Sequence, residues 1–211
     1  MDRRIRKYGK YMPSTIKGFF SGVLGIGSLF TFLFQELVGL VLSSTIWLCA
    51  GVYSLLTAGA RGVFTFSQRE SVSKKGRTDC AIIIAVIMLF ADISFCVLTN
   101  LRSLNFKIVR LPWFGFLILS VFGLSCFFKF LRQLFRIVRR KESSFFAYKI
   151  VSVSGMLKNF VLIQRLILSC LPFSDERIWQ VNSTFGYFIG AVLILLALWL
   201  LFRSIKERVK L

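Results

Sequence analysis

The sequence contains no histidine, and its five cysteines lie at positions 49, 80, 96, 126 and 170 without a Cys-x-x-Cys spacing. The usual His and Cys ligands of a zinc site are therefore missing, and we expect neither a bound metal nor a cofactor. Without a His base or a nucleophile motif, an enzyme is disfavoured. We expect the cysteines to pack as small buried hydrophobes, with a disulfide as an alternative for Cys170 alone.

Long polar segments are missing as well. The longest gap between apolar stretches runs from Arg61 to Thr78, is rich in Ser and Lys, and is too short for a soluble domain. In contrast, 56% of the 211 residues are hydrophobic, 24 are Phe, and the mean hydropathy is +0.73. One soluble core cannot bury that much apolar surface, so the composition predicts a single integral membrane domain.

The apolar stretches fit an all-α polytopic membrane bundle of six transmembrane helices. One span takes about 20 residues, and the stretch from Gly18 to Ala60 is roughly twice as long. We therefore place two helices in it, with a turn at Ser43-Ser44-Thr45, and we expect the first helix to be retained as an anchor. The six predicted spans cover residues 18–42, 45–66, 79–99, 111–131, 150–171 and 179–202.

Acidic residues are scarce, since 9 Asp and Glu face 28 Lys and Arg, for a net charge of +19. These cations flank apolar runs instead of covering a polar surface, which argues against a nucleic-acid partner. With six spans, most cations fall on one side, and the predicted outer loops keep only Arg102, Lys107, Arg110 and Arg177. The positive-inside rule then predicts cytoplasmic termini in a cell membrane, with the bacterial cytoplasmic membrane favoured, and anionic lipid headgroups as partners.

Four ionisable residues fall inside the predicted spans: Glu36, Asp92, Lys158 and Arg165. Each costs about 2.5–3.5 kcal/mol on insertion, so we expect them to be paired or functional. Glu36 and Arg165 both lie about 9 Å from the outer ends of their helices, and Asp92 is close to that level. We therefore predict that Arg165 pairs with Glu36 or Asp92. The cluster is then either a polar pathway or a set of salt bridges that fix helix order.

Two further patterns concern contacts with lipid and between helices. A basic stripe occupies one helical face and is predicted to contact anionic lipid; its residues are Lys129, Arg132, Arg136 and Arg139. Two glycine pairs with a spacing of four, Gly18/Gly22 and Gly186/Gly190, allow helices to approach closely. They predict close packing within the chain or, alternatively, in a homo-oligomer.

The segment from Leu37 to Arg69 (LVGLVLSSTIWLCAGVYSLLTAGARGVFTFSQR) has a small-residue outer turn and a second helix that ends in Ala-Arg-Gly. It resembles uncharacterised six-span membrane proteins of bacteria and, more distantly, the first two helices of cation diffusion facilitators. That resemblance implies the transmembrane bundle of the family. The family binds metal through pairs of acids or His four residues apart in helices two and five. The matched helix-two positions here are Ser54 and Ala58, so metal transport by the usual site is not implied.

These observations favour a small transporter-like or channel-like bundle for an ion or small solute. The intramembrane charges and the short loops are the features that point to it. The alternative is a non-catalytic structural or regulatory membrane partner, which needs no site at all.

Overall fold

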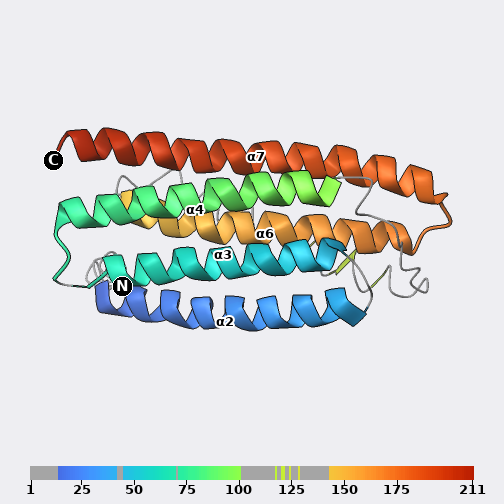
Figure 1. Ribbon diagram of the computed structural model, residues 1–211, viewed down its shortest axis with the longest axis horizontal. Helices are drawn as coiled ribbons and strands as arrows, with labels where there is room; N and C mark the ends of the chain where they lie inside the picture. Colours follow the sequence, from blue (N-terminus) through green and yellow to red (C-terminus); the bar gives the residue numbers. More distant parts are fainter. Residues whose placement is uncertain are drawn as a thin grey trace, which may run out of the picture.

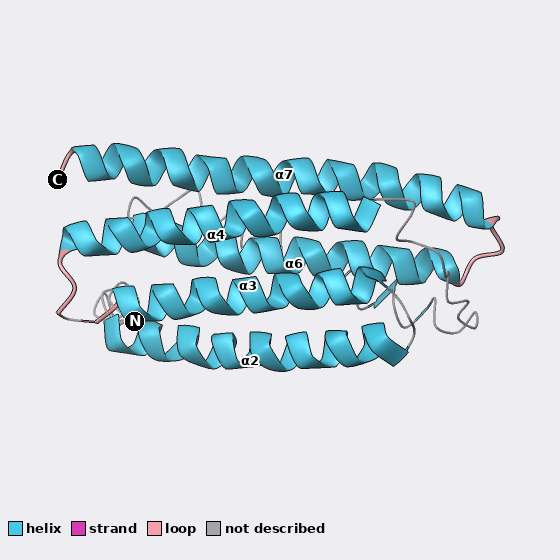
Figure 2. Cartoon of the chain, in the orientation of Figure 1, coloured by secondary structure: helices cyan, strands magenta, loops and turns pink. Residues whose placement is uncertain are grey.

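The structure is a computed structural model that describes residues 14–41, 45–69, 71–100 and 143–211, and positions 117, 120, 121, 124 and 128. Helices make up almost all of this part of the chain (Figure 2). The long helices are α2 (Ser14–Val41), α3 (Thr45–Ser67), α4 (Lys74–Asn100), α6 (Ser143–Ser169) and α7 (Asp175–Val209). The predicted all-α helical bundle is confirmed for the described residues.

The helices lie side by side along one axis (Figure 1). Helix α3 packs against α2, α4 and α6, and helix α7 packs against α4 and α6. The helix ends at residues 14, 67, 74, 143 and 209 gather at one end of the bundle, and the ends at 41, 45, 100, 169 and 175 at the other (Figure 1). We call the first the basic end, because Arg69, Lys74, Lys75 and Lys206 belong to it.

Three described helical segments are long and apolar enough to cross a membrane: Lys74–Val97, Phe146–Ser169 and Asp175–Val209. A shorter apolar helix covers Gly22–Leu37. Helix α2 ends at Val41, before the predicted turn, and helix α3 begins at Thr45, the last residue of that turn. Helix α7 extends beyond the predicted span 179–202 at both ends, because its polar first and last turns continue the helix outside the apolar stretch.

Large apolar side chains cover much of the outer surface of the bundle, and the helix contacts combine small residues with large ones. On α2 the side chains of Ile26, Phe30, Leu33, Leu37 and Leu40 are 57–69% exposed at a spacing of three and four. Several alanines of the other helices are instead fully buried at the contacts; they include Ala50, Ala60, Ala85, Ala147 and Ala197. Large side chains such as Tyr53, Phe146 and Met88 are buried beside these alanines. Small residues at helix contacts and large apolar residues on the outer surface fit helices that pack in lipid.

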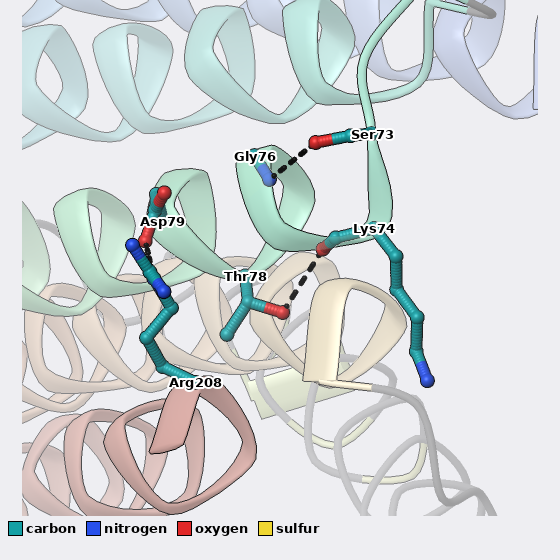
Figure 3. A network of polar contacts seen from close by, with 6 residues as sticks. All are labelled: Ser73, Lys74, Gly76, Thr78, Asp79 and Arg208. Atoms are coloured by element: carbon teal, nitrogen blue, oxygen red, sulfur yellow. Dashed lines mark hydrogen bonds and ion pairs between the residues drawn. The ribbon is translucent and has the colours of Figure 1, made fainter. Parts of the chain in front are cut away.

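At the basic end, polar contacts join the start of α4 to the last turns of α7 (Figure 3). The Ser73 hydroxyl accepts a hydrogen bond from the Gly76 N–H at 3.1 Å and so caps α4. The guanidinium of Arg208 on α7 forms an ion pair with the carboxylate of Asp79 on α4. Helix α7 also carries acids in its first turn and bases in its last, which complements the helix dipole.

One glycine of the predicted close-packing pairs has a clear partner. A Cβ at Gly190 on α7 would overlap the side chain of Cys96 on α4, so the absence of a side chain lets these two helices approach. At Gly22 on α2, no atom lies within 4 Å of an added Cβ. Gly190 therefore packs inside the chain, whereas a homo-oligomer through Gly18 and Gly22 stays a prediction.

Candidate functional site

A buried lysine joins three helices. Lys158 on α6 is 3% exposed, and its Nζ donates to Ser54 Oγ at 2.6 Å, Gln35 Oε1 at 3.2 Å and the Ala50 carbonyl at 3.3 Å. The Ser54 hydroxyl in turn donates to Gln35 Oε1 at 2.7 Å. Gln35 belongs to α2 and Ser54 to α3, so one ammonium group is shared by α2, α3 and α6. All of these partners are neutral.

The second buried charge lies on the other side of Tyr53. Asp92 on α4 is 0% exposed, and its Oδ1 accepts a hydrogen bond from the Tyr53 hydroxyl at 2.7 Å. Its Oδ2 has no hydrogen-bond partner among the described residues. The ammonium of Lys158 lies 5.6 Å from the centre of the Tyr53 ring, within the range of a cation–π contact. The structure therefore brings Lys158 and Asp92 to the same tyrosine.

The other two predicted charges gather nearer the opposite end of the bundle. The Glu36 side chain on α2 lies against Gly51 on α3, at a place where a Cβ would overlap it. Both Glu36 and Arg165 are within electrostatic range of the Cys49 thiol on α3. The four predicted residues thus divide into two groups, one at Tyr53 and one at Cys49. The predicted ion pair of Arg165 with Glu36 or Asp92 stays a prediction.

A cavity of about 250 Å³ lies between α2, α3 and α6, and its lining includes the buried Lys158 and Ser54 as well as the exposed Asn159. Each helix contributes one face at helical spacing, for example Ser54, Thr57 and Arg61 on α3. The polar side chains that line it are Ser28, Thr31, Ser54, Thr57, Arg61, Tyr148, Lys149, Ser152, Lys158 and Asn159. We take this cavity, together with the contacts of Lys158, as the candidate functional site.

A search of the sequence for charged residues inside apolar stretches misses several of these residues. Arg61 counts as a loop cation in the sequence, yet it lies inside α3 and lines the cavity. Thr57 and Ser152 are neutral hydroxyl residues in helices, and the signal that finds them is their spacing of three residues from Ser54 and from Lys149, respectively. The predicted lipid-contact stripe, Lys129, Arg132, Arg136 and Arg139, lies outside the described residues.

Comparisons of the chain with protein-family models, with curated proteins and with solved structures each find no match. The resemblance of Leu37–Arg69 to six-span bacterial proteins and to cation diffusion facilitators therefore stays a prediction. At the positions where that family binds metal in helix two, α3 has Ser54, which bonds Gln35, and Ala58, which is buried.

Proposed function

We propose that this protein is a multi-pass membrane protein whose bundle binds and moves an ion or small solute through the cavity between α2, α3 and α6. In this proposal six helices span a cell membrane, in the first instance the bacterial cytoplasmic membrane, and both termini are cytoplasmic. The basic end then faces the cytoplasm and its anionic lipid headgroups, in line with the positive-inside rule.

The observation that carries the proposal is a half-open cavity lined by polar and charged side chains, between three helices whose exposed side chains include many large apolar residues. Packing alone favours apolar and small residues between such helices, because each charge costs about 2.5–3.5 kcal/mol to insert. The lining of this cavity nevertheless includes three cationic side chains: Arg61, Lys149 and Lys158. An ionisable residue retained within a membrane is by default a candidate for a functional site, such as an ion or solute pathway.

The test is solute flux through the purified full chain in liposomes, with potassium, chloride, phosphate and glycerol as probes. Gly155 lines the cavity, and an added Cβ meets no atom within 4 Å, so Gly155→Leu fills the cavity without disturbing the backbone. Gly59→Leu is the matched control, because Gly59 is equally open but does not line the cavity. We expect the first variant to lose flux and the control to keep it. Equal flux in both variants, or no flux above protein-free liposomes, would contradict the proposal.

Topology is tested separately by cysteine labelling of the intact membrane. In a cysteine-free background, Ser73→Cys lies in the exposed turn before α4, and Glu176→Cys lies in the exposed first turn of α7. We expect an impermeant reagent to reach Ser73→Cys from the cytoplasm only and Glu176→Cys from outside only. Labelling of both from one side rules out the proposed arrangement.

A second candidate is a structural or regulatory membrane partner without a transported solute. It is favoured by the complete set of protein acceptors around Lys158, since its three donors already bond Gln35, Ser54 and Ala50. On this view the buried polar groups fix which helices are neighbours. Flux that is absent while the Lys158 contacts still stabilise the bundle would select it.

A further inference from the structure

We infer that the cavity between α2, α3 and α6 binds a phosphate group, either of a lipid headgroup or of a small free phosphate. The inference rests on the proposed function, because it names the chemical class of the solute that the same cavity takes. It follows from the sign of the charges, from their order along the cavity and from the neutral side chains between them.

The described side chains that line the cavity include three cations and neither Asp nor Glu. Lys158 has no ion pair among the described residues, and its Nζ contacts an amide oxygen, a hydroxyl, a backbone carbonyl and the Tyr53 ring. Arg61 and Lys149 both lie beside Tyr148 on α6. A cavity whose described lining carries cations and no acid has a positive potential that attracts an anion.

The cations are spread along the cavity instead of meeting at one point. On α6, Lys149 and Lys158 are nine residues apart, which is about 14 Å along the helix axis. Lys149 and Arg61 lie nearer the basic end of the bundle, and Lys158 lies farther from it, beside Ser54. The cations therefore occupy two levels along the bundle axis.

Hydroxyl groups fill the wall between these cations. Ser28 and Thr31 on α2 donate to the carbonyls of Leu24 and Gly27, and Ser152 on α6 donates to that of Tyr148. A hydroxyl can rotate its single donor from such a carbonyl to a ligand oxygen. Several donors and a guanidinium suit a ligand with several acceptor oxygens, and the cavity volume exceeds that of a monatomic ion. These features select phosphate over chloride.

The experiment measures the unfolding midpoint of the full chain in an uncharged detergent at constant ionic strength. One arm titrates inorganic phosphate, and the other titrates short-chain phosphatidylglycerol against an uncharged monoacylglycerol of equal length. We expect a saturable rise in midpoint in at least one phosphate arm. A response to inorganic phosphate identifies a free phosphate as sufficient, and a response to phosphatidylglycerol alone identifies the lipid as the source.

Variants assign the binding to the cavity. Arg61→Gln should weaken the apparent affinity about tenfold, since a charge-assisted contact is lost. The matched control is Arg69→Gln, because Arg69 is an exposed arginine just beyond the end of α3 and does not line the cavity. Gly155→Leu should abolish binding. Each variant is first shown to unfold at the wild-type midpoint without ligand, and Asn159→Leu at the exposed rim of the same cavity replaces any that does not.

The inference is overturned if neither phosphate arm responds, if chloride replaces phosphate with equal effect, or if Arg61→Gln and Arg69→Gln weaken binding equally. Its failure is distinct from that of the proposed function. Phosphate binding without flux in liposomes leaves the inference standing and removes transport. Flux of potassium or glycerol without phosphate binding leaves transport standing and removes the phosphate site.

Discussion

The hydrogen bond between Tyr53 and Asp92 gives the sharpest single prediction of stability. Tyr53→Phe removes only the hydroxyl that donates to Asp92 Oδ1 at 2.7 Å. The ring remains, so its contact with Phe95 at 5.3 Å between centroids and its position under Lys158 are kept. The variant therefore isolates one buried hydrogen bond between α3 and α4.

The expected loss in the free energy of unfolding depends on the buried Asp92 carboxyl, which remains after its donor is removed. Tyr53 and Asp92 are 1% and 0% exposed, and Asp92 Oδ2 has no partner among the described residues. A hydrogen bond to a charged group contributes about 1.5–3 kcal/mol in proteins, whereas hydrogen bonds between helices in membranes average about 0.6 and reach about 1.7 kcal/mol. Because the Tyr53 hydroxyl is the described donor to this buried carboxyl, we expect a loss of about 1.5 kcal/mol.

The measurement is the free energy of unfolding in mixed micelles as sodium dodecyl sulfate is added, followed by tryptophan fluorescence. Tyr187→Phe is the matched control, since Tyr187 is 53% exposed on α7 and should change stability by less than about 0.5 kcal/mol. In the double variant Tyr53→Phe/Asp92→Leu, the loss should fall short of the sum of the single losses by about 1 kcal/mol. Additive losses, or equal effects of the two Tyr→Phe changes, would refute this account.

Two further predictions concern helix α7. Arg208→Gln breaks the ion pair with Asp79, but both side chains are over a third exposed, so we expect a loss below about 1 kcal/mol that shrinks as salt is added to the unfolding assay. Gly190→Ala places a Cβ against Cys96 and should cost about 1–3 kcal/mol, whereas Gly62→Ala, which meets no atom within 4 Å, should leave the unfolding midpoint nearly unchanged. A Gly190→Ala bundle as stable as Gly62→Ala would show that α4 and α7 shift apart freely.

The helical class follows from the sequence because it depends on the length and hydropathy of single stretches. Val41 and Thr45 lie on either side of a run of small hydroxyl residues, and local turn chemistry suffices to place such a break. Helix neighbours depend on pairs of residues far apart in the chain, and a hydropathy pattern has no information on them. The packing of α4 against α7, with Asp79 and Arg208 separated by 129 positions, is an example.

The sequence predicts the buried charged residues of the candidate site but not their partners, for a similar reason. Lys158 and Asp92 are conspicuous as charges in apolar stretches, and both are buried. A comparison of helix depths pairs charges with charges, yet the partners observed for these two are Gln35, Ser54 and Tyr53. Neutral groups satisfy a buried ion without a second desolvation cost, so they compete well with an ion pair in lipid. The cavity itself depends on how three helices splay, which no single segment determines.

The ion pair between Asp79 and Arg208 also has a consequence for biosynthesis. The two residues are 129 positions apart, and at about 5–20 residues per second the ribosome adds Arg208 roughly 6–26 s after Asp79. During that interval α2 and α3 are free to form their hairpin, while the face of α4 that later receives α7 is covered by lipid or by the insertion machinery. We expect α4 to be the last of the early helices to acquire its final neighbours. A nascent chain that ends before α7 would then expose the face of α4 that α7 covers in the complete bundle.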